Sequence, residues 1–346
     1  MRQYTIKRIG LFLPTVLLVT LLVFVLMRII PGDPALAILE DEGGGSYTQE
    51  DLARLRHEIG TDRPIDIQYF TWIAGDWIAG IVRCGYSFGI SCGHVEGDPG
   101  IRGVVAGDFG NSLWFKSPVM GELKNRIPVT VELAIFAMVL AMVVAVPLGV
   151  VSAINPDSKL DYTARVFTLA GIALPTFFTA ILIILLLVTV FGWLPPLGYA
   201  SFWKDPSANL QQMFFPALAL AGYDLAFIAR VTRSSMMEIL REDYMRTARS
   251  KGLTERVVLA RHGLKNAFLP ILTISGWQFG RLFGGTIIIE TIFLVPGMGR
   301  ILIESIGHRD YVMIQAVIVI IGLSIVTINL LIDLLYGWLD PRIRFA

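Results

Sequence analysis

Charged residues are scarce in this chain of 346 residues. They make up 16% of the sequence, whereas hydrophobic residues make up 54%. A soluble globular protein of this size usually carries about 25% charged residues. The net charge of +1 gives no sign of the basic surface that binding to nucleic acid requires. The composition therefore predicts a membrane protein with no nucleic-acid partner.

Sequence motifs of catalysis and nucleotide binding are also absent. The chain has no G-x-x-x-x-G-K-[ST] phosphate loop, no H-E-x-x-H, no G-x-S-x-G and no dinucleotide fingerprint. Its histidines His57, His262 and His308 are isolated, so we expect structural or surface roles for them. We therefore expect no catalytic residue, no cofactor and no resident metal. A transporter or channel is favoured over a membrane enzyme, and any ATP-driven step needs another chain.

Long apolar runs are what the sequence has in abundance. A hydrocarbon core of about 30 Å requires about 20 apolar residues in a helix. Six segments meet this requirement and predict an all-α fold, a polytopic membrane protein with six transmembrane helices. The predicted spans are Ile9–Ile30, Thr130–Ile154, Arg165–Val190, Met213–Val231, Ile271–Phe293 and Val312–Trp338.

The distribution of Lys and Arg predicts the orientation of these spans. Six spans place both termini on one side, together with the segment 232–270, which carries eight Lys or Arg. The positive-inside rule makes that side cytoplasmic. The expected organisation is a transmembrane anchor at 1–30, an extracytoplasmic region at 31–128, a transmembrane core at 129–339 and a cytoplasmic tail at 340–346. A cleaved signal peptide is the alternative for the first span, which is longer than the usual apolar region of a signal.

Two cysteines, Cys84 and Cys92, fall in the predicted external region, within a glycine-rich segment. An oxidising exterior favours a local disulfide between them. Free thiols are the alternative. A metal site that also uses His94 is disfavoured, because no fourth ligand follows at a recognisable spacing.

The segment 232–270 predicts two short amphipathic helices separated by a bend at Gly252. Thr254 stands where it can cap the second helix. Such a surface either lies on anionic lipid or docks a cytoplasmic protein. The small or apolar residues Met237, Leu240, Tyr244 and Ala248 share one face of the first helix, and Val257, Ala260, Leu264 and Phe268 share one stripe of the second.

The same segment carries a specific resemblance. "RTARSKG" followed by "RHGLKNAFLP" resembles the coupling loop of binding-protein-dependent ABC importer permeases, in the form of the oligopeptide/dipeptide B subunits. The family motif begins Glu-Ala-Ala, and Arg246 stands at its acidic position, a departure common in the dipeptide branch. The segments "RIIPGDP", "GDFGNSL", "RIPVTVELA" and "GGTIIIETIFLVPGMG" resemble the same branch. Compared with that branch, the segment 81–105 looks like an insertion into the external region, and 129–339 would be the permease core.

The resemblance implies a type I importer permease of the inner cell membrane that takes up peptides. It implies four kinds of partner: a second homologous permease, two ABC ATPase subunits, an extracytoplasmic solute-binding protein and membrane lipid. A nickel-chelate or glutathione substrate is the alternative within this branch. An ATP-independent channel or secondary carrier is the alternative from another class, although such proteins have no use for a docking loop. The residues implied to meet the ATPase are Ala248, Gly252, Leu253, Thr254 and Glu255.

Ionisable residues inside predicted spans are candidates for function, because a charge is costly there. Asp224 and Arg281 lie at matching depths of about 13 and 16 Å from the cytoplasmic side, so we expect them to pair or to face a hydrated pathway. Glu290 lies near the outer end of the fifth span. It is expected either to line the external mouth or to cap the turn before Pro296.

Overall fold

The computed structural model describes residues 2–29, 33, 35–36, 39, 47–59, 61–75 and 102–339. These residues form α-helices with short 3-10 and π segments, and this part of the chain contains one isolated bridge but no strand. The predicted all-α class is therefore confirmed for the residues that the structure describes. Cys84, Cys92, most of the predicted insertion and the tail 340–346 lie outside them.

The chain divides into two compact units. The second unit comprises Val16–Ile127 and Ile301–Gly322, and contains α3 (Gln49–Ile59), α4 (Ile65–Ala74) and η1 (Val104–Ala106). Within it, Tyr69 on α4 packs edge-on against Phe24 on α1 (Arg2–Ile29), with ring centroids 5.3 Å apart. The Trp114 ring stacks on the His308 ring, with ring centroids 3.6 Å apart. Aromatic contacts thus hold the residues of this unit together.

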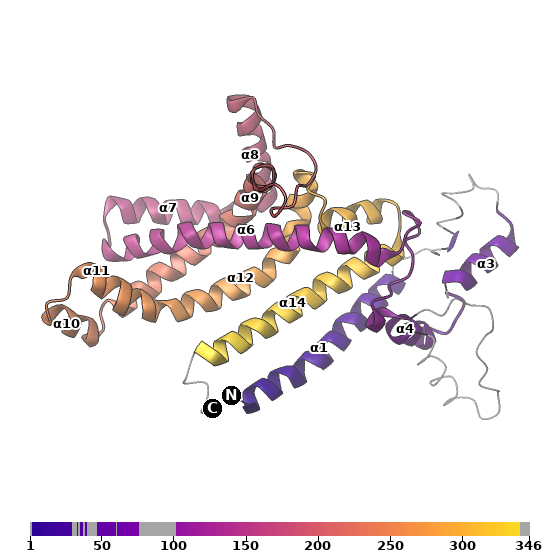
Figure 1. The fold of residues 1–346 in the computed structure, drawn as a ribbon, viewed down its shortest axis with the longest axis horizontal. Helices are drawn as coiled ribbons and strands as arrows, with labels where there is room; N and C mark the ends of the chain where they lie inside the picture. Colours follow the sequence, from indigo (N-terminus) through magenta and orange to yellow (C-terminus); the bar gives the residue numbers. More distant parts are fainter. Residues whose placement is uncertain are drawn as a thin grey trace. The chain divides into compact units, whose positions relative to one another are not determined.

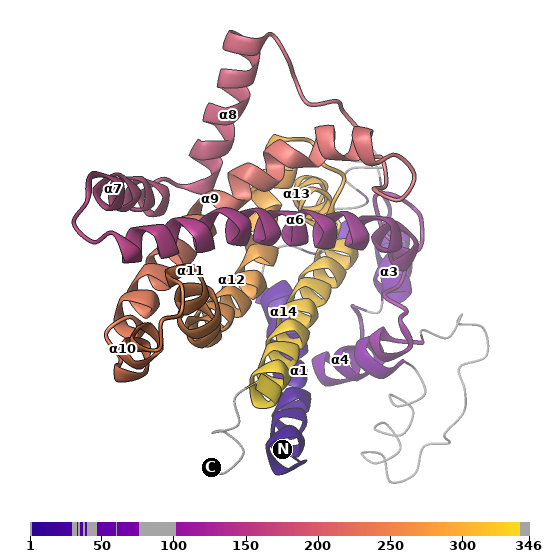
Figure 2. The same cartoon turned by 60° about the vertical axis from the view of Figure 1, so that its left-hand side comes forward.

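The first unit comprises Met1–Thr15, Pro128–Arg300 and Leu323–Ala346. In Figures 1 and 2, α10 and α11 lie at the same end of this unit as the turn that joins α6 to α7. Some of its helices continue into the second unit. Besides the start of α1, the helices that lie wholly or partly in it are α6 (Val119–Ile154), α7 (Lys159–Ala173), α8 (Thr176–Phe191), α9 (Pro206–Ile239), α10 (Asp243–Ser250), α11 (Glu255–Val257), η2 (Val258–Leu264, a π segment), α12 (Lys265–Ile292), α13 (Met298–Gly307) and α14 (Tyr311–Leu339).

Small residues let the long helices of the first unit approach closely. A Cβ added at Gly149 on α6 would lie 2.6 Å from the carbonyl oxygen of Ala229 on α9. A Cβ at Gly276 on α12 would lie 2.8 Å from a side-chain carbon of Ile332 on α14. Helices in lipid associate through such close packing, because burial from water no longer drives them together. Glycine is therefore required at both crossings.

Helix ends in this unit follow from local sequence. The Ser158 side chain accepts a hydrogen bond from the Asp161 amide at the start of α7, and the Asp205 side chain accepts one from the Ala208 amide at the start of α9. Both are N-caps, which satisfy amides that the first turn leaves unpaired. Gly192 ends α8 in a left-handed conformation, with φ of 60°.

The predicted span at Arg165–Val190 is sharply bent in the structure. The helix breaks between α7 and α8, whose axes are bent by 108°. Pro175 is the reason, since it excludes the helical conformation of the preceding residue, and Leu174 is extended with φ of −85° and ψ of 127°. Figures 1 and 2 show α8 turning away from the α6 and α7 pair.

Four described helices, α1, α6, α9 and α14, are long and apolar enough to cross a membrane. The bent pair α7 and α8 makes a fifth candidate if it is taken as one span. Helix α12 covers the predicted fifth span, with 28 residues, but is not among the four. Its polar residues, among them Gln278, Arg281 and Glu290, lower its hydropathy. The count of six spans therefore stays a prediction.

Candidate coupling loop and intramembrane charges

The loop between α9 and α12 folds into two short helical segments. After α9 ends at Ile239, the chain turns and forms α10, then passes through Gly252 into α11 and the π segment η2, which runs directly into α12. Gly252 has φ of +76°, in the left-handed region that favours glycine. The predicted bend therefore occurs at the predicted residue.

The inner side of this loop is a small apolar cluster. Met245 and Ala248 on α10 pack with Val258 on η2, against Ile239 and Leu240 at the end of α9. Gly263 makes room for this packing, because an added Cβ would lie 3.2 Å from the terminal carbon of Met236. The cluster fixes both loop helices to the end of α9. Ala248 therefore packs on the inner side of the loop, with only 6% of its surface exposed.

Of the eight residues on the two predicted apolar faces, only Ala248 is buried within the chain. Tyr244 and Phe268 are exposed, at 40% and 45%, while Met245 and Val258 are fully buried. Non-helical residues between α9 and α10 turn the first helix relative to the expected periodicity. The π segment, with its wider turn, shifts the second helix in the same way.

The outer side of the loop is open. A Cβ at Gly252 would meet nothing within 4 Å, and Leu253 is 40% exposed. The Arg249 guanidinium bridges the bend, since its Nη2 lies 2.9 Å from Glu255 Oε1 and its Nε donates to Glu255 Oε2 at 3.2 Å. Hydrogen bonding from Arg249 holds the pKa of Glu255 below its ordinary value. The bend is thus braced by a bidentate ion pair and leaves its backbone accessible.

Thr254 occupies the N-cap position of α11, as predicted, but its side chain makes no capping hydrogen bond. Its carbonyl oxygen instead accepts bonds from the amides of Val257 and Val258. The Thr254 hydroxyl therefore takes no part in capping α11.

Asp224 on α9 and Arg281 on α12 meet inside the first unit. Arg281 Nη2 lies 2.7 Å from Asp224 Oδ1, and Arg281 Nε donates to Gln278 Oε1 at 3.0 Å. The guanidinium carbon also lies 4.0 Å from the centre of the Tyr223 ring. The pair is asymmetric, because the Asp224 side chain is 1% exposed and that of Arg281 is 42% exposed. One partner is desolvated while the other reaches the surface of the chain.

Glu290 is fully buried near the end of α12 and organises the start of α13. Its Oε1 accepts a hydrogen bond from Thr130 Oγ1 at 2.7 Å, and its Oε2 accepts from the Gly299 amide at 2.7 Å and the Arg300 amide at 3.2 Å. Gly297 is required beside it, since an added Cβ would lie 2.3 Å from the carboxyl carbon. These contacts favour the turn-capping alternative over an exposed position at a mouth.

Sequence reasoning missed a second charged cluster, between α6, α7 and α9. Asp161 is fully buried and accepts bonds from Arg233 Nε at 2.7 Å and Nη2 at 2.9 Å, from Arg165 and from Ser152. The four-residue spacing of Asp161 and Arg165 on a helix could have predicted their ion pair. The contact with Arg233 could not have been predicted from the sequence, because 72 residues separate Arg233 from Asp161.

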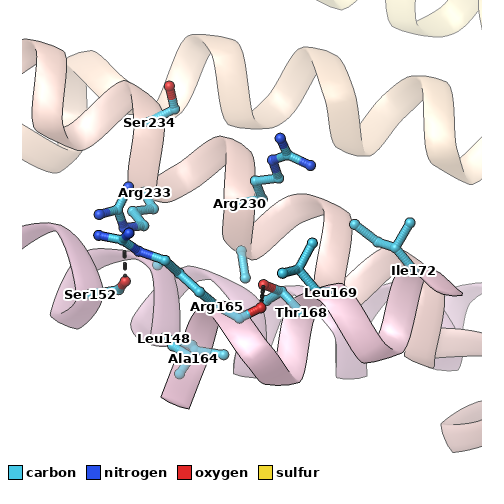
Figure 3. A pocket seen from close by; sticks show the side chains of 12 residues that line it. Leu148, Ser152, Ala164, Arg165, Thr168, Leu169, Ile172, Arg230, Arg233 and Ser234 are labelled. Atoms are coloured by element: carbon cyan, nitrogen blue, oxygen red, sulfur yellow. Dashed lines mark hydrogen bonds between the residues drawn. The ribbon is translucent and has the colours of Figure 1, made fainter. Parts of the chain in front are cut away.

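The cluster borders a pocket of about 320 Å³, shown in Figure 3. Its walls come from α6, α7 and α9. In the described part of the chain, no group of three or more His, Cys, Asp or Glu side chains is placed to hold a metal ion. The residues that line the pocket are Leu148, Gly149, Ser152, Ala164, Arg165, Thr168, Leu169, Ile172, Ala229, Arg230, Arg233 and Ser234.

Comparison with known protein families accounts for nearly the whole chain. Residues 145–345 match the family described as binding-protein-dependent transport system inner membrane component. Residues 1–134 match the family that describes the N-terminal part of such membrane components.

Similar proteins cover the full length. A protein of Brucella abortus (strain 2308), named as a peptide transport system permease, is 36% identical over 345 residues and covers 100% of both chains. The dipeptide transport system permease protein DppB of Escherichia coli (strain K12) is 35% identical over 367 residues, with 99% of each chain covered. A crystal structure of an amino acid ABC transporter with histidines matches 63% of this chain and 94% of its own, with a TM-score of 0.50 and 18% identity. That last likeness concerns the fold alone.

Proposed function

Because the chain belongs to the family of binding-protein-dependent transport system inner membrane components, we propose that it is the permease subunit of an ABC importer for short peptides. Relatives named as peptide and dipeptide permeases align over the full length and support this substrate class. The family is a transport family, so the chain moves solute and leaves ATP hydrolysis to partner subunits.

The proposed topology has six spans, with α7 and α8 together as the third and α12 as the fifth. Both termini and the loop 232–270 face the cytoplasm in this arrangement. The eight Lys and Arg of that loop support it through the positive-inside rule. The polar residues of α12 are compatible with a span, because polar groups in membrane proteins face a bundle interior or a hydrated pathway.

The loop of α10, α11 and η2 is proposed to dock an ABC ATPase subunit. The observation that carries this proposal is the Gly252 bend: its backbone is open on the outer side, while the inner side is fixed to α9 by the Met245 cluster. Gly252, Leu253, Thr254 and Glu255 would form the contact surface, and Ala248 would support it from inside. A rigid docking element can transmit the closure of an ATPase dimer as a movement of whole helices.

The loop is connected to the intramembrane pair by its two ends. Helix α9 enters the loop and carries Asp224, and helix α12 leaves it and carries Arg281. A push on the loop would therefore move the two helices that the Asp224 and Arg281 pair joins. We place this pair beside the translocation pathway, because a half-exposed guanidinium at such depth requires water or a polar partner.

The assembly proposed around this chain contains a second homologous permease, two ATPase subunits and an extracytoplasmic binding protein. The test is uptake by an importer reconstituted from this chain, a second permease, ATPase subunits and a binding protein. Labelled dialanine should enter proteoliposomes only with internal ATP and external binding protein. Uptake without ATP would overturn the importer in favour of a channel or carrier. Uptake of glutathione or a nickel chelate, but no dipeptide, would overturn the substrate class.

A further inference from the structure

We infer that the pocket between α6, α7 and α9 binds the phosphate group of an anionic phospholipid. This site lies apart from the proposed coupling surface and from the Asp224 and Arg281 pair. It combines three features that such a lipid requires: unbalanced positive charge, an apolar wall and a position at the membrane interface.

The charge of the pocket is positive. Arg165 and Arg233 both bind the buried Asp161, and Arg165 also contacts the exposed Asp157 at 2.9 Å. Arg230 lines the same pocket, is exposed, and makes no hydrogen bond or ion pair within the described part of the chain. Three guanidinium groups therefore face two carboxylates. The excess charge lies at Arg230, the arginine free to bind an incoming phosphate with its planar fork of donors.

The wall of the pocket is apolar at its other end. Figure 3 shows Arg165 and Arg233 meeting near Ser152, with Leu169 and Ile172 further along α7. Both line the pocket, and Leu169 is 59% exposed. A phosphate held by Arg230 would have its acyl chains beside this surface. A soluble phosphate has no use for such a wall, which favours a lipid.

The position of the pocket fits the boundary of a bilayer. Helix α9 has 34 residues, or about 51 Å, so it extends well beyond a hydrocarbon core of about 30 Å. Arg233 lies six residues before the end of α9, and Arg165 lies six residues after the start of α7. Each is therefore about 9 Å from its helix end. Basic pockets between membrane helices at this depth are suited to anionic head groups.

The test is lipid retention by the assembled importer, purified from membranes that contain phosphatidylglycerol and phosphatidylethanolamine and analysed by native mass spectrometry. The unaltered complex should retain phosphatidylglycerol. Arg230→Gln should lower the affinity about five-fold, the loss expected for one interfacial cation. Lys159→Gln is the matched control, because Lys159 is an exposed cation on α7 that does not line the pocket. Leu169→Gln should lower lipid retention as well.

Three outcomes would overturn the inference. The first is equal retention by the unaltered complex and Arg230→Gln, and the second is an equal loss in Arg230→Gln and Lys159→Gln. The third is displacement of the lipid by inorganic phosphate, with Leu169→Gln unaffected, which would assign the site to a soluble phosphate. Gel filtration of each variant checks assembly, and Arg230→Gln removes no contact on which the described fold depends.

Discussion

Two pairs of arginine and carboxylate in the first unit have similar geometry and opposite surroundings. Arg249 and Glu255 lie 2.9 Å apart on the coupling loop, and Arg281 and Asp224 lie 2.7 Å apart between α12 and α9. The Glu255 side chain is 53% exposed, whereas that of Asp224 is 1% exposed. An exposed pair contributes little, because water solvates each charge when the other is removed. A buried carboxylate that loses its partner stays desolvated, and this is costly.

The comparison assigns a different role to charge in each region. On the loop, the ion pair only braces a bend, and the open backbone at Gly252 is what a partner can meet. In the membrane, the pair itself makes the helices compatible with their surroundings. Changes on the loop should therefore affect coupling and leave folding intact, while changes in the membrane should affect folding first.

The largest effect is expected from Gly252→Trp. The indole has open space within this chain, so the loop should fold, but its bulk would prevent docking of the ATPase and the backbone would be strained at φ of +76°. Peptide-stimulated ATP hydrolysis by the reconstituted importer should be abolished, while insertion into the membrane should stay normal.

Two variants separate bulk from backbone strain at this position. Gly252→Asn keeps a residue that tolerates the left-handed conformation, so it should retain most of the stimulation. Gly198→Trp is the matched control, because Gly198 also has positive φ, of +100°, and nothing within 4 Å. Normal stimulation in Gly252→Trp, or equal losses in both tryptophan variants, would remove the docking assignment.

The next largest effect is expected at the intramembrane pair. Arg281→Gln leaves the Asp224 carboxylate buried and unpaired, at a cost of about 3–5 kcal/mol. Asp224→Asn should cost less, because Arg281 is half-exposed and keeps its contacts with Gln278 and Tyr223. The double variant should fold better than Arg281→Gln alone. Folded yield, measured by fluorescence-detected gel filtration, gives the complete double-mutant cycle.

The outcome of that cycle also decides between structure and pathway. Additive losses would show that the two side chains do not depend on each other. Normal yield in all three variants with reduced peptide uptake would instead favour a pathway role, in which both residues contact the charged ends of the solute.

A smaller effect is expected from Glu290→Gln. The amide keeps the shape of the side chain but replaces one of its two acceptor oxygens with an NH2 donor, so either the Thr130 hydroxyl or the Gly299 and Arg300 amides lose their acceptor. A buried polar group left without its partner costs about 1–3 kcal/mol, so we expect a lower midpoint of thermal unfolding. Glu238→Gln, at an exposed position on α9, is the control and should leave the midpoint unchanged. An unchanged midpoint in Glu290→Gln would mean that the turn does not need both carboxyl oxygens as acceptors.

Local sequence predicted the features that depend on nearby residues. Hydropathy located most of the long helices, and glycine chemistry located the bend at residue 252. Features that depend on the geometry between helices could not be predicted from local sequence. The turn after Ile239 and the π segment η2 shift the buried face of the loop, so Met245 is buried while Tyr244, on the predicted apolar face, is exposed. Arg233 and Asp161 are 72 residues apart, and nothing in a single sequence connects them.

The smallest effect is expected from Arg249→Gln, which tests the exposed side of the comparison. It removes a bidentate pair at the bend, but both side chains are solvated, so the loss of stability should not exceed about 1 kcal/mol. The pKa of Glu255 lies below its ordinary value of 4.5, so the contribution of the pair is complete above pH 4.5 and disappears as the pH falls below it. Thermal unfolding of the unaltered chain and the variant should therefore differ slightly at neutral pH, with the difference reduced by high salt and by acid. A loss as large as that of Arg281→Gln would show that the loop pair is not exposed in the folded protein, and would end the contrast between the two regions.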